Sequence, residues 1–169
     1  LDLLWVASPN HLHLEHIKTG LEAGLKVFSE KPIVTTKEDS FILAKLIKKY
    51  GESQLIVGLV LRYSVHMREL RRILDAGTLG NITSLEANEH IAPFHGSFFM
   101  RDWRRLEKYS GGFMLEKCCH DIDLYNSIVG DRPSRVISFG GRNNFIPSEA
   151  PNGDEHDDVY QIKKSYWES

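Results

Sequence analysis

The stretch LKVFSEKPIVTTKE, residues 25–38, decides the fold class. Its residues 26–29, Lys-Val-Phe-Ser, predict a short β-strand, and Glu30-Lys31-Pro32 is the turn that follows this strand. Thr35 or Thr36 then provides the cap of a helix, because a hydroxyl at this position accepts from a free backbone N–H. The stretch is therefore a strand, a turn and the start of a helix.

The same alternation continues on both sides of this stretch. Residues 1–6 predict an earlier strand and residues 11–23 a helix, while residues 55–59 predict a third strand. This order is typical of parallel strands joined by helical crossovers, and the low alternation of 55–59 favours a sheet covered on both faces. We therefore predict an α/β fold in which residues 1–60 form one half of a doubly wound parallel sheet.

The pattern changes near residues 59–64, where we place a boundary between two structural units, 1–60 and 61–169. Beyond it the sequence predicts these elements: a helix over 65–76, a strand over 81–91, a loop over 92–110, a helix over 113–129, a strand over 136–140, a polar loop over 146–158 and a strand over 159–162. The second unit is therefore also expected to mix helices and strands.

Composition excludes several classes of protein. The chain has 169 residues, is 41% hydrophobic and 26% charged, and carries a net charge of −2, so it is globular and has no general attraction for nucleic acid or anionic membranes. No apolar run approaches the roughly 18 residues that cross a bilayer, and no signal peptide is recognised. The adjacent Cys118 and Cys119 rarely form a disulfide, which favours a reducing, cytoplasmic compartment.

Both ends of the chain are expected to be cut. The strand at 1–6 stands at one terminus and the strand at 159–162 at the other, and a strand needs neighbours for its backbone groups. We therefore expect a fragment of a longer protein. The alternative is a small complete domain with edge strands at both termini.

The predicted helix over 113–129 carries three ionisable side chains on one stripe. At about 100° per residue, Glu116, His120 and Asp123 fall within an arc of about 60°. A carboxylate four residues before a histidine can accept its N–H and raise its basicity, which suits proton transfer to or from a hydroxyl. The alternative is a solvated helix face that carries an ion pair.

Two predicted strands end in residues that could meet a ligand, because open α/β sheets bind ligands at the carboxyl edge of their strands. Lys31 could orient a substrate oxygen there, and Pro32 could fix the turn through a cis bond. Ser8-Pro9-Asn10 follows the preceding strand and could turn backbone N–H groups toward a cofactor, with His13 one turn later. The alternatives are a surface lysine in a turn and a solvent-facing histidine.

Other site types have weaker support. His11, His13 and His16 could suggest a metal, but the C-x-x-C spacing typical of zinc sites is absent, and we predict no metal site. The sequence also contains no Ser-His-Asp nucleophile elbow, no Walker loop and no G-x-G-x-x-G motif.

An ordered set of motifs resembles the Gfo/Idh/MocA oxidoreductases, which include glucose-fructose oxidoreductase and inositol dehydrogenase. The set comprises Ser8-Pro9-Asn10 with His13, Ala23-Gly24, Lys26-Val27-Phe28, Glu30-Lys31-Pro32, and Gly111-Gly112 followed by Glu116 and His120-Asp121-Ile122-Asp123-Leu124. The resemblance implies a Rossmann domain that binds NAD or NADP, then an α/β domain with an open, mostly antiparallel sheet that carries the substrate site and often an oligomer interface. It also implies hydride transfer between nicotinamide and a carbon of a sugar, polyol or related alcohol.

The resemblance also implies roles for individual residues. Lys31 is similar to a lysine that contacts substrate and nicotinamide ribose, His120 to the catalytic acid/base, and Glu116 stands where the family commonly has aspartate. The cofactor-side positions are Ser8, Pro9, Asn10, His13, Glu30 and Lys31. The substrate-side positions are Arg62, Tyr63, Trp103, Arg104 and Asp123. These roles require the Lys31 amine and the His120 imidazole to meet in one cleft.

The chain departs from the family pattern at its start, where the first strand and the glycine-rich turn are absent. Residues 1–60 then correspond to the second half of a Rossmann-type sheet, and residues 61–169 to a truncated substrate and oligomerisation domain, expected to form a homo-oligomer. The chain alone is expected to bind NAD(P) weakly and to be inactive. The rival hypotheses are a non-catalytic, ligand-binding or regulatory member of the same fold and a metal-dependent hydrolase.

Overall fold

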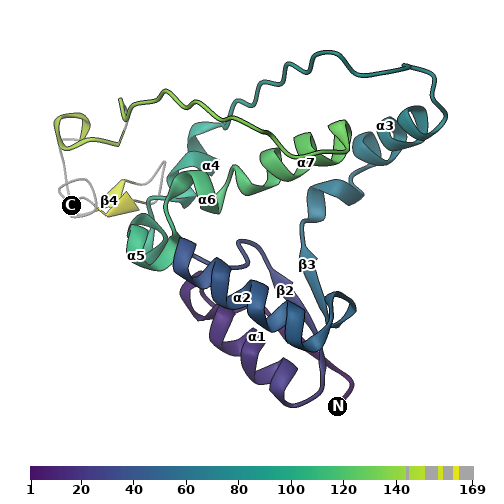
Figure 1. Ribbon diagram of the computed structural model, residues 1–169. Coiled ribbons are helices and arrows are strands. Elements are labelled where there is room, and N and C mark those ends of the chain that lie inside the picture. Colours follow the sequence, from purple (N-terminus) through teal and green to yellow (C-terminus); the bar gives the residue numbers. More distant parts are fainter. Residues whose placement is uncertain (144, 151–155, 158–161, 164–169) are drawn as a thin grey trace.

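A computed structural model describes residues 1–143, 145–150, 156–157 and 162–163. Strands β1 (Leu3–Val6), β2 (Lys26–Glu30) and β3 (Leu55–Gly58) form a parallel sheet in the order β1-β2-β3. Helices α1 (His13–Glu22) and α2 (Lys37–Tyr50) connect them and lie side by side on one face of the sheet (Figure 1). The predicted order of strands and helices in residues 1–59 is confirmed.

The hydrophobic core lies between this sheet and its two helices. It consists of the buried residues Val6, Ile17, Leu21, Val27, Val34 and Leu43. Burial of each such aliphatic side chain contributes about 1.5–3 kcal/mol to folding. The helix α2 begins as predicted, because the Thr36 hydroxyl accepts a hydrogen bond of 3.1 Å from the Asp39 backbone N–H. This core fixes the positions at which β1 and β2 end.

We predicted that both faces of the parallel sheet are covered by other elements. This prediction is wrong for the part of the chain that the structure describes. Both helices pack on the same face, and on the other face Trp5 and Ile56 are 61% and 50% exposed. The Trp5 ring rests on the Phe28 ring there, with 4.5 Å between centroids. The apolar run misled the prediction because apolar residues occupy the exposed face as well as the buried one.

The second unit is mainly helical. Its helices are α3 (Val65–Asp75), α4 (Pro93–Phe98), α5 (Glu107–Ser110), α6 (Phe113–Glu116) and α7 (Cys119–Val129). Short 3-10 turns occur in both units: η1 (Asn10–Leu12) and η2 (Glu52–Gln54) lie in the first, η3 (Val60–Tyr63) at the boundary, and η4 (Asp102–Arg105) and η5 (Pro147–Glu149) in the second. The helix predicted over 65–76 is confirmed. The loop predicted over 92–110 is wrong, because α4, η4 and α5 lie within it.

The strands predicted over 81–91 and 136–140 are also wrong. These residues form no ladder in the structure, and Val136, Ile137 and Phe139 are exposed. A strand needs a neighbour for its backbone N–H and C=O groups, and the described residues supply none at these positions. The antiparallel pairing described is between β4 (His156–Asp157) and β5 (Ile162–Lys163), so the open antiparallel sheet is not found.

The remaining predictions near the carboxyl end are tested only in part. Residues 159–161 of the predicted terminal strand lie outside the described residues, as do 151–155 and 158 of the predicted polar loop. No helix in the described parts of the chain is long and apolar enough to cross a membrane.

The single helix predicted over 113–129 is broken in the structure. Helix α6 ends at Glu116 and α7 begins at Cys119, and Lys117 and Cys118 form a turn between the two helices. The His120 N–H then donates to the Lys117 carbonyl, three residues back, at 3.3 Å. The break changes the direction in which Glu116 points relative to His120.

Candidate active site

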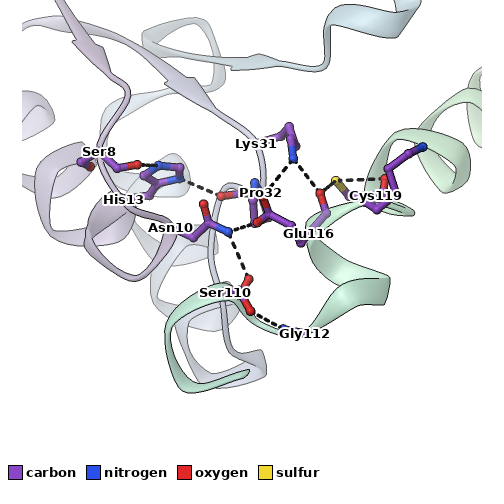
Figure 2. Close-up of polar contacts among 10 residues, drawn as sticks. Ser8, Asn10, His13, Lys31, Pro32, Ser110, Gly112, Glu116 and Cys119 are labelled. Carbon is purple, nitrogen blue, oxygen red and sulfur yellow. Dashed lines mark hydrogen bonds and ion pairs between the residues drawn. The ribbon is translucent and has the colours of Figure 1, made fainter. Parts of the chain in front are cut away.

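Lys31 extends from the end of β2 to the end of α6. Its peptide bond to Pro32 is cis, as predicted. The Lys31 Nζ donates to the Glu116 backbone carbonyl at 2.6 Å and lies 3.4 Å from the Glu116 carboxylate oxygen Oε1 (Figure 2). The carbonyl is therefore the closer partner and the carboxylate a second one. The Lys31 side chain is 22% exposed and the Glu116 side chain 6%, so the amine is the accessible end of this pair.

Asn10 holds the same carboxylate from the turn that follows β1. This residue is buried in η1, and its Nδ2 donates both to the Ser110 carbonyl at 3.2 Å and to Glu116 Oε2. In Figure 2 the Asn10 amide and the Lys31 amine approach Glu116 from two neighbouring turns. Parallel strands end at one edge of their sheet, which is why two distant sequence positions meet on one side chain.

His13 braces these two turns against each other. It is buried in the first turn of α1, its Nδ1 lies 2.8 Å from the Pro32 carbonyl oxygen, and its Nε2 lies 2.8 Å from the Ser8 carbonyl oxygen. The Ser8 hydroxyl in turn contacts His16 Nδ1 at 2.9 Å. The side chains of Asn10 and His13 therefore face protein, and the solvent-facing alternative for His13 is wrong.

His120 is buried at the start of α7, one turn after Glu116. Burial lowers its pKa below the usual value, and the positive charges of Lys31 and Lys117 lower the pKa further. Its Nδ1 is buried and has no hydrogen-bond partner among the residues that the structure describes. A neutral imidazole of this kind is able to accept a proton.

The hydrogen bond that the i,i+4 spacing would allow between Glu116 and His120 does not occur among the contacts of the described residues. The Glu116 carboxylate contacts Asn10 and Lys31 instead, and the helix is interrupted directly after this residue. Asp123, the third member of that stripe, pairs instead with Arg62 through two hydrogen bonds of 2.5 and 2.6 Å. The three residues that we predicted to share one helix face therefore do not contact one another, and each has a different environment.

The predicted substrate-side residues divide between two cavities. Arg104 of η4 and Glu116 line a cavity of about 450 Å³, and the Trp103 ring contacts the Arg104 guanidinium at 4.4 Å. Arg62 and Tyr63 line a second cavity of about 600 Å³ beside α3. Glu30 ends β2 opposite Gly58 of β3, and Pro9 precedes η1. The cavity that adjoins the Lys31 and Glu116 pair is therefore the one lined by Arg104.

Sequence reasoning missed Ser110. Its carbonyl accepts from Asn10, and its hydroxyl accepts from the Gly112 N–H at 3.1 Å. Gly111 and Gly112 both have φ of +83°, and a side chain on Gly111 would collide with Leu115. The glycine pair was visible in the sequence as the start of a helix, but its partner across the site was not.

Lys117 and the two cysteines were also not predicted to belong to the site. Lys117 is buried and pairs with Glu89 at 2.6 Å and with Asp121 at 3.7 Å. The Cys119 Sγ lies 3.7 Å from the Glu116 carbonyl oxygen, and burial raises the pKa of this thiol. The described residues include no group of three or more His, Cys, Asp or Glu that could hold a metal ion.

Comparison with known proteins identifies the family. Residues 1–59 match the oxidoreductase family with an NAD-binding Rossmann fold, and residues 67–162 match the GFO/IDH/MocA C-terminal domain. The chain belongs to the GFO/IDH/MocA family. The resemblance stated from the motifs is therefore confirmed, and with it the Rossmann-like class of the first unit.

Similar proteins include dehydrogenases. YteT of Bacillus subtilis, an oxidoreductase by name, is 30% identical over 151 residues, which are 89% of this chain and 35% of YteT. The apo scyllo-inositol dehydrogenase of Lactobacillus casei is 27% identical with a TM-score of 0.61, over 77% of this chain and 36% of that one. The WlbA dehydrogenase of Thermus thermophilus, solved with NAD and α-ketoglutarate, is 25% identical with a TM-score of 0.54, over 76% and 40%. The chain thus spans well under half of these relatives.

Proposed function

We propose that this chain carries part of the active site of an NAD(P)-dependent oxidoreductase, which transfers a hydride between nicotinamide and a sugar, polyol or related alcohol. The proposal depends on the contact of Lys31, from the first unit, with Glu116, from the second. His120 follows Glu116 by one turn, and it is buried and neutral because its pKa is lowered. An amine donor and a proton acceptor beside each other are what the oxidation of an alcohol requires.

The residues at the ends of β1 and β2 fit the nicotinamide end of such a cofactor. The Lys31 amine is partly exposed at the carboxyl edge of the parallel sheet, and the backbone of Ser8, Pro9 and Asn10 lies at the same edge. Lys31, with Glu30 and the Ser8–Asn10 turn, would hold the nicotinamide riboside there. When bound, the nicotinamide supplies the acceptor or donor of the hydride.

Each residue then has one task in the oxidation of an alcohol. His120 accepts the hydroxyl proton at a ring nitrogen, while the carbon gives up its hydride and the C–O bond becomes a carbonyl. Lys31 donates a hydrogen bond to the same oxygen and stabilises the negative charge that develops on it. Glu116, whose carboxylate accepts a hydrogen bond from Asn10, holds the Lys31 amine in place, and reduction follows the same steps in reverse.

The wider organisation belongs to the same proposal. Residues 1–60 form the cofactor unit and residues 61–169 the substrate unit, since the strand–helix alternation stops after β3 and η3 leads into α3. Arg62, Tyr63, Trp103, Arg104 and Asp123 are proposed to serve the substrate side. We also propose a cytoplasmic homo-oligomer that associates through the second unit.

The test uses the full-length protein and follows NAD(P)H absorbance with a panel of polyols and sugars. His120→Ala and Lys31→Met should each lower kcat/KM by about 10²–10⁴-fold, as expected for loss of an acid/base group. The exposed His66→Asn and Lys45→Met are matched controls and should leave the rate unchanged. Activity retained in both His120→Ala and Lys31→Met would overturn the assignment. Substrate binding without hydride transfer by the unaltered protein would favour a non-catalytic member of the fold.

A further inference from the structure

The cavity of about 450 Å³ beside Glu116 has the size of a small-molecule site. Its wall includes residues of α4, η4, α5 and α6, together with residues 141–143 and 145. Glu116, which contacts Lys31 on one side, also forms part of this wall. A ligand in the cavity therefore lies next to the groups proposed to move the proton.

More basic than acidic side chains line this cavity. Three arginines line it, Arg104, Arg105 and Arg142, against the two carboxylates of Glu107 and Glu116. The Glu116 charge is already paired with Lys31 and hydrogen-bonded to Asn10. By count of lining side chains, the cavity wall therefore carries three cationic groups and two anionic ones.

Two aromatic rings contact the Arg104 guanidinium. Its guanidinium carbon lies 4.3 Å from the centre of the Phe98 ring and 4.4 Å from that of Trp103. Within the described part of the chain, no carboxylate pairs with this guanidinium, and its buried Nε has no hydrogen-bond partner. A guanidinium whose faces contact aromatic rings keeps its N–H edge free, and that edge matches the two oxygens of a carboxylate or phosphate.

Three other arginines of the second unit have partners within the protein. Arg62 is engaged by Asp123 and Arg72 by Glu69, each through more than one hydrogen bond, and Arg71 contacts Ser127 and Asp75. Their charges are therefore neutralised or shared within the protein. Arg104 combines a place in the cavity wall with a guanidinium left without an anionic partner.

We propose that this cavity binds the oxyanion of an acidic monosaccharide, a carboxylate or a phosphate, through Arg104. The proposal rests on the proposed function, whose substrate it narrows from sugars and polyols in general to sugars that carry a negative charge. The oxyanion binds the edge of the Arg104 guanidinium, and the sugar ring extends toward Glu116 and the Lys31 amine. Arg105 and Arg142 add to the positive charge of the site.

The test compares charged and neutral sugars in the full-length protein. The probes are D-glucuronate and D-galacturonate, D-glucose 6-phosphate, and the neutral D-glucose and D-galactose. Binding is measured by calorimetry and turnover by NAD(P)H absorbance. We expect at least one anionic sugar to bind about 10–100-fold more tightly than its neutral counterpart, the range that follows from hydrogen bonds to a charged group. The uronate and phosphate arms show which oxyanion the site takes.

Variants of Arg104 test whether this residue causes the preference for anionic sugars. Arg104→Gln should lower the affinity for the anionic sugar to that of its neutral counterpart, and Arg104→Lys, which keeps the charge but loses the paired donors, should retain a part of the preference. Arg135→Gln, an exposed arginine outside the cavity, is the control and should behave like the unaltered protein. If Arg104→Gln does not fold, the calorimetric comparison in the unaltered protein still decides whether a preference exists.

The outcomes separate this inference from the proposed function. Turnover of neutral sugars with no preference for an anion would overturn the inference and leave the oxidoreductase assignment standing. Binding of an anionic sugar that depends on Arg104, without turnover of any probe, would support the inference and contradict the assignment. A preference that survives in Arg104→Gln, or no binding by any anionic probe, would overturn the inference.

Discussion

Replacing Glu116 with glutamine separates the two ways in which Lys31 is held. The substitution keeps the length of the side chain and an oxygen able to accept from Asn10. It removes the negative charge 3.4 Å from the Lys31 amine and leaves the 2.6 Å contact with the Glu116 backbone carbonyl. The loss of stability on Glu116→Gln therefore reports the ion pair, and the loss on Lys31→Met reports both contacts.

The magnitudes follow from distance and burial. Two unit charges 3.4 Å apart attract by about 5 kcal/mol at an effective dielectric constant of about 20. The desolvation of a carboxylate that is 6% exposed offsets most of this attraction, so we expect Glu116→Gln to cost about 1–2 kcal/mol. Lys31→Met leaves a buried carboxylate whose remaining partner is the neutral Asn10, and should cost about 3 kcal/mol.

Urea unfolding of the two single variants and the double variant completes a thermodynamic cycle. The double variant has no unpaired buried charge, so its loss of stability should be about 1–2 kcal/mol smaller than the sum of the two single losses. Lys45→Met, at an exposed position on α2, is the matched control and should show no measurable change. Additive losses within about 0.3 kcal/mol would refute the ion pair between Lys31 and Glu116.

Three further predictions concern groups around this pair. Since burial and then the charges of Lys31 and Lys117 lower the pKa of His120, the acid limb of the pH–rate profile should lie below pH 6.5, and Lys31→Met should shift it upward. Stability should also fall as pH drops below 6.5, because the unfolded chain takes up this proton first; a limb or a decline that begins above pH 6.5 would contradict the assignment. Burial raises the pKa of Cys118 and Cys119, so their alkylation by iodoacetamide, followed by mass spectrometry, should be slower at neutral pH than that of free cysteine and should still rise above pH 9.0. Arg62→Lys removes the paired donors to Asp123 at a half-exposed site, and urea unfolding should show a loss below about 1 kcal/mol, whereas a loss above about 2 kcal/mol would mean that the pair does more than a surface contact.

The first unit was predictable because its signals are local. Strand, turn and helix cap follow one another within residues 25–38, and the Thr36 cap and the ends of β2 and β3 depend on near neighbours. The place of Lys31 at a ligand-binding edge then follows from topology alone, since parallel strands end on the same side of their sheet. The coverage of the sheet was not predictable in this way, because an apolar run does not reveal which of its faces is packed.

The second unit was predicted less well because its conformation depends on distant contacts. The segments 81–91 and 136–140 have residues typical of strands, but a strand exists only with a neighbour, and the sequence does not say where that neighbour lies. The spacing of apolar residues over 113–129 fits an unbroken helix. Contacts from Asn10, Lys31 and Glu89 to the two residues at the break, Glu116 and Lys117, accompany its division into α6 and α7.

The partners of Glu116 and His120 at that break set the electrostatics of the site. In a continuous helix the Glu116 carboxylate would lie one turn from His120 on the same face and would raise the pKa of its imidazole. In the structure the carboxylate is bound by Lys31 and Asn10, while His120 stays buried beside the positive charges of Lys31 and Lys117, which lower its pKa. The same three side chains therefore supply a neutral base and a fixed ammonium donor in place of a charged histidine, and a neutral base is the form that can take a proton from an alcohol.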